Sequence, residues 1–443
     1  MILHVPYTFA PDPVGGTEIY VAALCRGLVR EGWSVHVAAP GDPALSGTVD
    51  GLQVTRLPVL DRPQSAEGVS DPVTLEAFEL LLDRLAPRIV HLHARTAAVS
   101  HRLLEAARAR DIRTVFTYHT PTASCPRGTM LLYGAEPCDG VLDDTRCTRC
   151  VLESHGVPRR PAALIARAPV ALGRLATCAG LRHGPARGVR MRQIVHDGRR
   201  RFARLIAASD RVVAVCDWVA DVLRHNGTPE DKLVLSRQGL AEGASPYHRS
   251  PAEPFLGPQA GALRVGFFGR LDQTKGLEVL VEAIRGSAAN IALTVHGVAQ
   301  AGSERYAAAL MALAGEDSRI SFRPPVPSHA VVSTMSGIDV VAVPSLWMET
   351  GPLVVLEAFA AGCPVLGSNL GGIAELVRDG FNGRLLPPGD ALAWRAALET
   401  LAGDPTILAR WRSGIVPPRT IRDVVRDMVG LYDDLQRDPG KAK

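Results

Sequence analysis

The sequence predicts an α/β protein of two domains, each built around a doubly wound parallel sheet. Three observations carry this prediction. The chain has 443 residues, which is too long for one ordinary hydrophobic core. Short apolar runs alternate with stretches of helical periodicity, as in sheets whose parallel strands are joined by helices. The alternation is interrupted by a stretch with several prolines and glycines, 244–261, and then starts again.

The first domain is expected over residues 1–245. Its apolar runs predict strands at 2–5, 34–38, 53–56, 89–93, 114–117, 211–215 and 232–236. Helical periodicity between them predicts helices at 17–31, 74–85 and 97–109. This order of elements is typical of a parallel sheet.

The second domain is expected over residues 262–420, and a helix and tail over 421–443. Strands are predicted at 263–268, 291–296, 320–322 and 340–343, and helices at 276–285, 303–313 and 421–436. Ligands of such sheets bind beyond the carboxyl ends of the strands. Candidate site residues are therefore sought just after each predicted strand.

The bulk composition indicates a soluble globular protein. Hydrophobic residues make up 47% and charged residues 21%, with a net charge of +4. The start of the chain, 1–6, reads as a first strand rather than a signal peptide, and no apolar run is long enough to span a bilayer. We therefore expect a cytoplasmic protein whose thiols are reduced.

Two glutamates eight positions apart, Glu349 and Glu357, flank a Gly-Pro turn. Glu357 lies in an almost wholly apolar stretch, where an unpaired carboxylate is costly, so a solvated surface charge explains it poorly. Pro352 suits the first turn of a helix, and free amides at a helix start bind anions or sugar oxygens. A carboxylate further along the helix can accept hydrogen bonds from vicinal hydroxyls.

Two cations five positions apart, Arg270 and Lys275, follow the predicted strand at 263–268. Guanidinium and ammonium groups held in one loop suit a diphosphate. An exposed loop pair without function is the alternative that the spacing alone leaves open.

Together these segments closely resemble the retaining glycosyltransferases of sequence family 4. The resemblance runs from about residue 263 to 388 and includes the runs 371–375 and 380–383. It implies the GT-B fold, two Rossmann-like domains facing a cleft, and a nucleotide-diphosphate sugar as donor.

The resemblance also implies a role for each site residue. Glu357 would bind the donor ribose and Glu349 the transferred sugar, while Arg270 and Lys275 would neutralise the diphosphate. Donor sugar and phosphate would be held by the turn Gly351, Pro352 and Leu353. The chain contains no Asp-x-Asp sequence, which fits transfer without a metal or other cofactor at the diphosphate.

In the first half, the resemblance singles out two more places. Gly15 and Gly16 follow the first strand, where glycine lets a backbone approach a ligand, and would contact acceptor or phosphate. His119 follows the predicted strand at 114–117 and would lie near the reacting sugar. By themselves, a Gly-Gly pair and a lone histidine are more often structural.

Four cysteines cluster at 125–150 with the spacing C-x12-C-x8-C-x2-C; they are Cys125, Cys138, Cys147 and Cys150. Four thiolates in one loop are typical of a structural zinc site. An iron–sulfur cluster and unligated or redox thiols are the alternatives.

A basic helical segment, 157–205, contains twelve arginines and one aspartate. It is either a set of solvated helices or a surface for an anionic membrane or lipid-linked acceptor at the inner membrane face. Nucleic acid is not expected, because stacking aromatics are scarce there.

The sequence therefore predicts a retaining glycosyltransferase of polysaccharide or glycolipid synthesis. Two alternatives remain open: a GT-B relative with other chemistry, such as an epimerase or phosphorylase, and an inactive zinc- and anion-binding module. Departures from the family pattern at His296-Gly297 and at 323–325 leave the nucleotide base undetermined.

Overall fold

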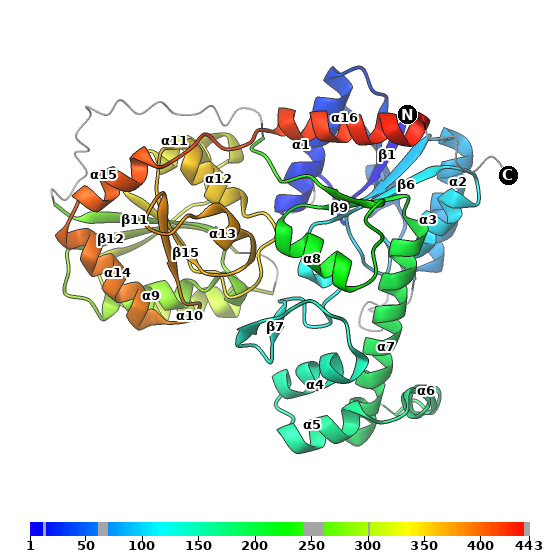
Figure 1. Cartoon of the computed structure of the whole chain (residues 1–443), viewed down its shortest axis with the longest axis horizontal. Coiled ribbons are helices and arrows are strands. Elements are labelled where there is room, and N and C mark those ends of the chain that lie inside the picture. Colours follow the sequence, from blue (N-terminus) through cyan, green and yellow to red (C-terminus); the bar gives the residue numbers. More distant parts are fainter. Residues whose placement is uncertain (12–14, 61–69, 182, 242–260, 300–301, 438–443) are drawn as a thin grey trace. The chain divides into compact units, whose positions relative to one another are not determined.

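The structure is a computed structural model, and it describes residues 1–11, 15–60, 70–181, 183–241, 261–299 and 302–437 (Figure 1). The chain divides into two units, of which unit 1 comprises Met1–Arg237 and Arg422–Lys443 and unit 2 comprises Gln238–Ile421. The sequence placed the first boundary at 245 and treated 421–443 as a separate segment, whereas the structure joins the final helix to unit 1. The predicted linker at 244–261 falls almost wholly outside the described residues.

Unit 1 contains an eight-stranded sheet in the order β10-β9-β6-β5-β1-β2-β4-β3. Its strands are β1 Ile2–Val5, β2 Val35–Pro40, β3 Gly47–Val49, β4 Leu52–Leu57, β5 Ile89–Leu92, β6 Arg113–Tyr118, β9 Arg211–Ala214 and β10 Leu233–Leu235. Neighbouring strands are parallel, except that β3 runs antiparallel to β4. The predicted parallel sheet is confirmed, and β3 is an addition that the sequence did not reveal.

Five helices pack around the unit 1 sheet in the described residues, and the residues that precede α2 and α3 set where these two begin. The five helices are α1 Gly16–Arg30, α2 Pro72–Leu85, α3 His101–Arg108, α8 Asp217–His225 and α16 Ile421–Arg437. The Asp71 carboxylate accepts hydrogen bonds from the amides of Val73 and Thr74, which fixes the start of α2. Helix α3 begins later than the predicted residue 97, because Ser100 has extended backbone and is its N-cap.

The final helix, α16, belongs to unit 1 because its apolar face packs there. Buried side chains recur at helical spacing; they are Val424, Val425, Met428, Leu431, Tyr432 and Leu435. A Cβ at Gly27 of α1 would lie 2.4 Å from the Val425 side chain, so the two helices approach closely only with glycine there. Residues from the end of the chain thus complete the core around β1.

A helical extension of unit 1 carries the cysteine-rich and basic segments. It consists of the hairpin β7 Leu131–Leu132 and β8 Glu136–Pro137, and of helices α4 Asp144–Ser154, α5 Arg159–Ala166, α6 Val170–Cys178 and α7 Pro185–Ala208. The long helix α7 packs against α4, α5 and α6 and also contacts α3 and β6 (Figure 1). Arg182, one of the basic residues, lies outside the described residues.

Unit 2 contains a six-stranded, wholly parallel sheet in the order β13-β12-β11-β14-β15-β16. The strands are β11 Leu263–Arg270, β12 Ile291–Val298, β13 Ile320–Arg323, β14 Val340–Val343, β15 Val365–Ser368 and β16 Gly383–Leu386. The helices are α9 Leu277–Arg285, α10 Glu304–Ala314, α11 Val331–Met335, α12 Leu353–Ala360, α13 Gly371–Leu376, α14 Ala391–Gly403 and α15 Thr406–Ser413. Strands β15 and β16 were not predicted.

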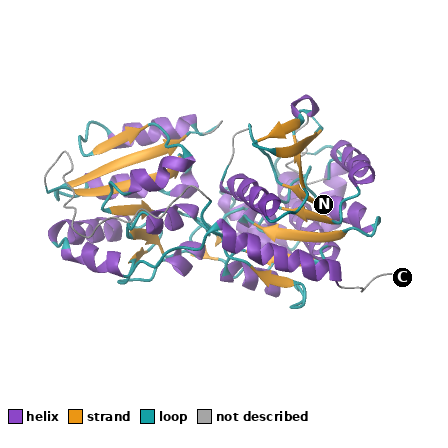
Figure 2. Ribbon diagram, turned by 90° about the horizontal axis from the view of Figure 1, so that it is seen from above, coloured by secondary structure: helices purple, strands orange, loops and turns teal. Residues whose placement is uncertain are grey.

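Both faces of the unit 2 sheet are covered by helices (Figure 2). Along β14, Val340 and Ala342 join one hydrophobic cluster and Val341 and Val343 join the other. A strand buried on both faces is therefore apolar at every position, as the sequence is here. Among the described residues, no helix is long and apolar enough to cross a membrane.

Candidate active site

The candidate site in unit 2 lies at the carboxyl ends of the adjacent strands β11 and β14. Arg270 is the last residue of β11, and Lys275 ends a short 3-10 turn, η4 Gln273–Lys275. Glu349 follows β14 and has an exposed fraction of only 8%. The fold therefore brings both predicted cations and the first predicted glutamate to one edge of the sheet.

The loop that carries Lys275 packs closely against the loop after β14 and is hydrogen-bonded to it. Gly276 has φ +65°, and a Cβ there would lie 2.1 Å from the carbonyl oxygen of Pro344. The amide of Leu346 donates to the carbonyl of Thr274 at 2.7 Å. A glycine is required at this position both by its backbone conformation and by the close approach.

Glu349, which is buried, forms an ion pair with the partly exposed Lys275. The Nζ of Lys275 lies 2.5 Å from Oε1 of Glu349, and Ser345 Oγ donates to the same oxygen at 2.8 Å. Burial opposes ionisation of Glu349, but the Lys275 ammonium and hydrogen bonds, including that from Ser345, outweigh it and hold its pKa below the usual value. Lys275 also lies 5.3 Å from the centre of the Trp347 ring. The sequence reasoning assigned no role to Ser345 or Trp347.

The Gly-Pro turn leads directly into α12. Pro352 is the residue before this helix and not part of its first turn, so the predicted position is wrong by one residue. Since proline has no N–H, the amides that this turn can offer to a ligand come from Gly351 and Leu353. A Cβ at Gly351 would lie 2.7 Å from the side chain of Gln238. The buried Oε1 of Gln238 has no hydrogen-bond partner among the described residues, and the sequence reasoning missed this residue.

Glu357 differs from Glu349 in having no partner. Among the described residues, none donates a hydrogen bond to its carboxylate or forms an ion pair with it. Burial raises its pKa to about 7. An unpaired carboxyl on a buried helix is typical of a functional group rather than a structural one.

Strand β12 contacts the run 323–325, where the sequence departs from the family pattern. Nδ1 of His296 lies 3.0 Å from the carbonyl oxygen of Pro324 and can donate to it. The His296 ring stacks on Phe268 with centroids 5.0 Å apart. His296 therefore positions this run against the end of β11.

In unit 1, the two predicted glycines begin α1. Gly15 is the N-cap, and its amide donates to Oε2 of Glu18 at 2.9 Å. That donor is therefore already used within the helix start. Gly16 is exposed and is the first helical residue.

His119 lies directly after β6 and belongs to a cluster of buried imidazoles with His4, His91 and His93. Nε2 of His119 lies 3.1 Å from Nδ1 of His93, and Nε2 of His93 lies 2.9 Å from Nδ1 of His4. His91 contacts Tyr432 and Thr117. Sequence reasoning found only His119, although the His-x-His pattern at the end of the predicted strand 89–93 was a usable signal.

The four cysteines do not form one ligand set. The described residues contain a single group of three or more metal-ligating side chains whose atoms lie within 4.8 Å of one another, and it consists of His4, His91 and His93. The Cys150 sulfur is buried and accepts a hydrogen bond from the amide of Tyr133 at 3.1 Å. The sulfur atoms of the four cysteines are not grouped within that distance in the described residues, and zinc at this segment remains a prediction.

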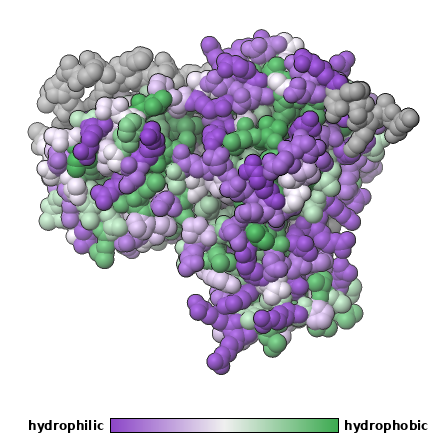
Figure 3. All heavy atoms as spheres, in the orientation of Figure 1, coloured by the Kyte–Doolittle hydropathy of each residue, from purple (hydrophilic) through white to green (hydrophobic). Residues whose placement is uncertain are grey.

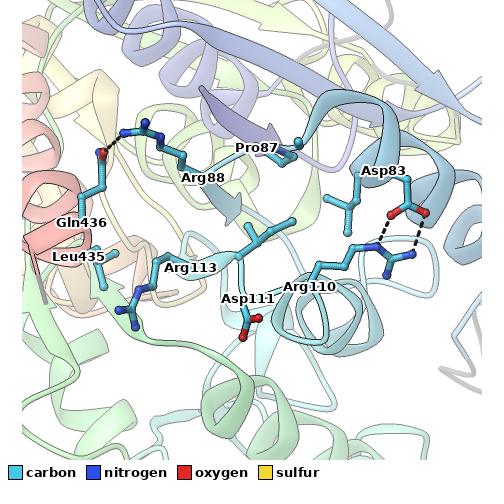
Figure 4. A pocket seen from close by; sticks show the side chains of 11 residues that line it. Asp83, Pro87, Arg88, Arg110, Asp111, Arg113, Leu435 and Gln436 are labelled. Atoms are coloured by element: carbon cyan, nitrogen blue, oxygen red, sulfur yellow. Dashed lines mark hydrogen bonds and ion pairs between the residues drawn. The ribbon is translucent and has the colours of Figure 1, made fainter. Parts of the chain in front are cut away.

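One pocket of unit 1 lies away from all these residues. It has a volume of about 580 Å³ and lies at the amino ends of β5 and β6, with Arg88, Arg110 and Arg113 around it (Figure 4). Arg110 is paired with Asp83 at 2.6 Å and Arg88 bonds Gln436. Its cations are partly neutralised, and it faces the sheet edge opposite to His119, so we do not assign it to the donor.

Two family models match the chain. One, glycosyl transferases group 1, matches residues 254–414, and the other, glycosyltransferase family 4, matches residues 14–169. This chain belongs to glycosyltransferase family 4.

The D-inositol 3-phosphate glycosyltransferase of Nocardia farcinica is 34% identical over 219 residues, covering 47% of this chain and 48% of that protein. The protein of the same name from Stackebrandtia nassauensis is 32% identical over 247 residues, covering 52% and 55%. The family 4 chain thus spans about half the length of the curated relatives it matches.

The similarity of this chain to solved structures identifies its fold. HepE of Anabaena, crystallised with UDP and glucose, has a TM-score of 0.64 and 16% identity, covering 98% of this chain and 100% of that one. The sucrose-phosphate synthase of Thermosynechococcus elongatus has a TM-score of 0.67 and 19% identity, covering 98% and 99%. The predicted GT-B fold of this family 4 glycosyltransferase is confirmed.

Proposed function

We propose that the chain transfers a sugar from a nucleotide-diphosphate sugar to an acceptor hydroxyl, with retention of the anomeric configuration. The observation that carries the proposal is the partly buried Lys275–Glu349 pair at a sheet edge that also holds Arg270. Family membership supports the reaction class. The fold neighbour HepE binds UDP, so UDP-sugars are the first donors to test.

Each predicted residue has a task in this reaction. Arg270 and Lys275 offset the charge of the diphosphate, and Glu349 accepts hydrogen bonds from the transferred sugar. Glu357, which has no side-chain partner among the described residues, accepts hydrogen bonds from the ribose hydroxyls. The amides of Gly351 and Leu353 donate to sugar and phosphate oxygens.

The transfer step needs no external reactant. The acceptor oxygen forms a bond to the anomeric carbon on the same face from which the diphosphate leaves. The bond between that carbon and the phosphate oxygen breaks, and the acceptor proton passes to the departing diphosphate. The protein contributes positioning and charge stabilisation, with the His119 ring near the sugar.

Donor binding tests the site directly. Saturation-transfer NMR with UDP-, GDP- and ADP-sugars is expected to show binding of one donor class to the wild type. Glu357→Ala is expected to weaken it, whereas Glu316→Ala, which alters an exposed glutamate of the same unit, is a matched control. If no nucleotide sugar binds, or if both variants bind like the wild type, the assignment of this site is wrong.

We also propose that the helical extension of unit 1 contacts an anionic membrane surface that presents a lipid-linked acceptor. Leu164 and Leu175 of α5 and α6 are 75% and 65% exposed, and Leu181 is 54% exposed. Apolar and polar side chains are intermixed on the face seen in Figure 3. The arginines of this extension differ in how free they are to bind lipid headgroups, because Arg192 and Arg199 of α7 pair with Asp144 of α4. Arg159, with a side chain 86% exposed, remains open to solvent for lipid headgroups.

Vesicle sedimentation tests this surface. Vesicles with phosphatidylglycerol are expected to bind the protein, and neutral phosphatidylcholine vesicles are expected not to. The double variant Leu164→Ser/Leu175→Ser should lower binding several-fold, while Leu392→Ser in unit 2, which is 68% exposed, should not. Equal binding to both vesicle types would contradict the proposal.

Zinc at the cysteine-rich segment is tested by metal analysis of purified protein. The prediction expects about one zinc ion per chain and its loss in Cys147→Ser. Cys178→Ser, which alters an exposed cysteine outside the segment, is the control. Zinc-free wild-type protein with an ordered fold would show that the thiols are unligated.

A further inference from the structure

The side-chain amide of Gln238 is buried without a hydrogen-bond partner. Gln238 is the first residue of unit 2 and has an exposed fraction of 8%. Its Oε1 is closed to solvent, and no group of the described residues donates a hydrogen bond to it. Most buried polar atoms of side chains do have a partner, and an exception calls for a functional explanation.

The backbone around Gln238 is held in place by contacts that do not involve its amide. Leu240 makes two backbone hydrogen bonds with the segment 419–421, at 2.9 Å and 2.7 Å. A Cβ at Gly239 would lie 2.3 Å from the carbonyl oxygen of Thr420, so the two segments are in close contact. Leu240 also belongs to the hydrophobic cluster that contains the buried residues of α12. The amide is therefore available for another task.

The Gln238 amide packs on the Gly-Pro turn that precedes α12. A Cβ at Gly351 would lie 2.7 Å from Cδ and 3.0 Å from Nε2 of Gln238. Gly372 supports the same turn, because its amide donates to the carbonyl of Glu349 at 2.6 Å. A Cβ at Gly372 would lie 3.1 Å from Cδ of Pro352. The unpartnered amide thus lies at the turn that the proposed function gives to the donor sugar and phosphate.

The chemistry of an amide selects among the groups of a nucleotide sugar. Oε1 of Gln238 is an acceptor, so it needs a donor, and an ionised phosphate oxygen is an acceptor only. A hydroxyl can donate to the carbonyl and can also accept from the NH₂ group. Gly351 is closer along the chain to Glu349, proposed for the transferred sugar, than to Glu357, proposed for the ribose. A hydroxyl of the transferred sugar therefore matches the amide best.

We propose that Gln238 is a donor-site residue, whose side-chain amide binds a hydroxyl of the transferred sugar and contributes to the choice of sugar. The inference rests on the proposed function, because it requires a nucleotide sugar at this turn. An apolar side chain of similar length would pack on Gly351 without burying an unpaired amide. The free energy that the unpaired amide costs is offset when the sugar binds, and a sugar without the matching hydroxyl leaves it unpaired.

A purely structural role is the competing explanation. Gln238 would then be a spacer against Gly351, and an ordered water would satisfy its amide. This explanation predicts that the amide has no effect on the affinity for a nucleotide sugar. It also predicts that removing the amide lowers the stability of the free protein, because the water-mediated contact is lost.

Calorimetric titration of the full-length protein distinguishes the two roles. Each nucleotide sugar is compared with its own diphosphate: UDP-glucose with UDP, GDP-mannose with GDP and ADP-glucose with ADP. Gln238→Met should weaken binding of the nucleotide sugar by about three- to tenfold, the loss of one neutral hydrogen bond, and leave binding of the diphosphate unchanged. Gln53→Met, at an exposed glutamine of β4, is the matched control and should change neither.

Thermal denaturation provides the second readout. Since no described residue bonds the amide, Gln238→Met should melt at or above the wild-type temperature, and Gln238→Leu is a second variant with the same expectation. Loss of folding or a lower melting temperature in both variants would overturn the proposal. Unchanged affinity for the nucleotide sugar in Gln238→Met, or an equal loss for the diphosphate, would overturn it while leaving the proposed function intact. Wild-type protein that binds no nucleotide sugar would contradict the proposed function itself.

Discussion

The carboxyl ends of the two sheets carry side chains of different chemistry. In unit 2, the edge of β11 and β14 is charged, with a partly exposed ammonium and a buried carboxylate 2.5 Å apart. In unit 1, the edge of β1, β5 and β6 carries neutral imidazoles in hydrogen-bond contact. A diphosphate requires fixed charge, whereas sugar hydroxyls require directed donors and acceptors. This contrast is consistent with the proposal that unit 2 binds the donor and that unit 1 orients hydroxyl groups.

The largest effect is expected from breaking the charged edge. Lys275→Met removes the cation beside the buried Glu349 carboxylate, so we expect the free energy of unfolding to fall by about 3 kcal/mol and donor binding to be lost. Chemical denaturation and calorimetric titration measure the two effects. The double variant Lys275→Met/Glu349→Gln should recover most of the stability without recovering donor binding. Full stability in the single variant would contradict the buried ion pair.

The loop that carries Lys275 provides the next test. Gly276→Ala should lower the free energy of unfolding by about 2–4 kcal/mol, because a side chain is strained at positive φ and would also collide with Pro344. Gly362→Ala is the control, since its φ is +67° but a Cβ there would meet open space. It should cost only about 1 kcal/mol. Equal losses in thermal denaturation would show that the close approach to Pro344 is not tight.

Glu357 should show a stability that depends on pH. Its pKa is raised to about 7, so the folded state favours the neutral form and loses stability as pH rises from the unfolded value through 7. Glu357→Gln should therefore increase the free energy of unfolding by about 1–2 kcal/mol at pH 8 and have no effect near pH 4. Denaturant titrations at the two pH values measure this. A destabilised variant at pH 8 would mean that the carboxylate has a stabilising partner.

The same carboxyl predicts the pH profile of donor binding, with a smaller effect. Since the ionised form accepts hydrogen bonds from ribose hydroxyls, donor affinity should rise severalfold as pH increases through about 7. In Glu357→Gln this rise should be absent. Calorimetric titrations between pH 5.5 and 8.5, about one and a half units on either side of that pKa, give the profile. A matching rise in the variant would assign the titration to another group.

Much of the fold followed from local pattern. The strands Ile2–Val5 and Val340–Val343 were predicted at their observed bounds, because buried parallel strands are continuous apolar runs. Strands Val365–Ser368 and Gly383–Leu386 were missed, since short runs with glycine are ambiguous between strand and turn. The start of α3 was misplaced because its N-cap, Ser100, makes no side-chain hydrogen bond that marks the boundary.

The site was predictable only where its residues share a short segment. Glu349, Glu357, Arg270 and Lys275 were found from spacing and family resemblance, but the 2.5 Å contact between Lys275 and Glu349 joins residues 74 positions apart. Tertiary contacts also bring His4 to His93 and Tyr432 to His91, which spacing does not reveal. For the same reason, the cysteine spacing alone does not show whether the four sulfur atoms meet at one metal ion, and zinc there stays a prediction.

The most direct test of the central claim is proton NMR of the reaction with the donor found by the binding screen. The account predicts release of the nucleoside diphosphate and a product, or a hydrolysed sugar at early times, with the same anomeric configuration as the donor. An inverted anomer would contradict the retaining mechanism. A donor that binds but never releases nucleoside diphosphate, with any acceptor supplied or with water, would contradict the assignment of the site to glycosyl transfer.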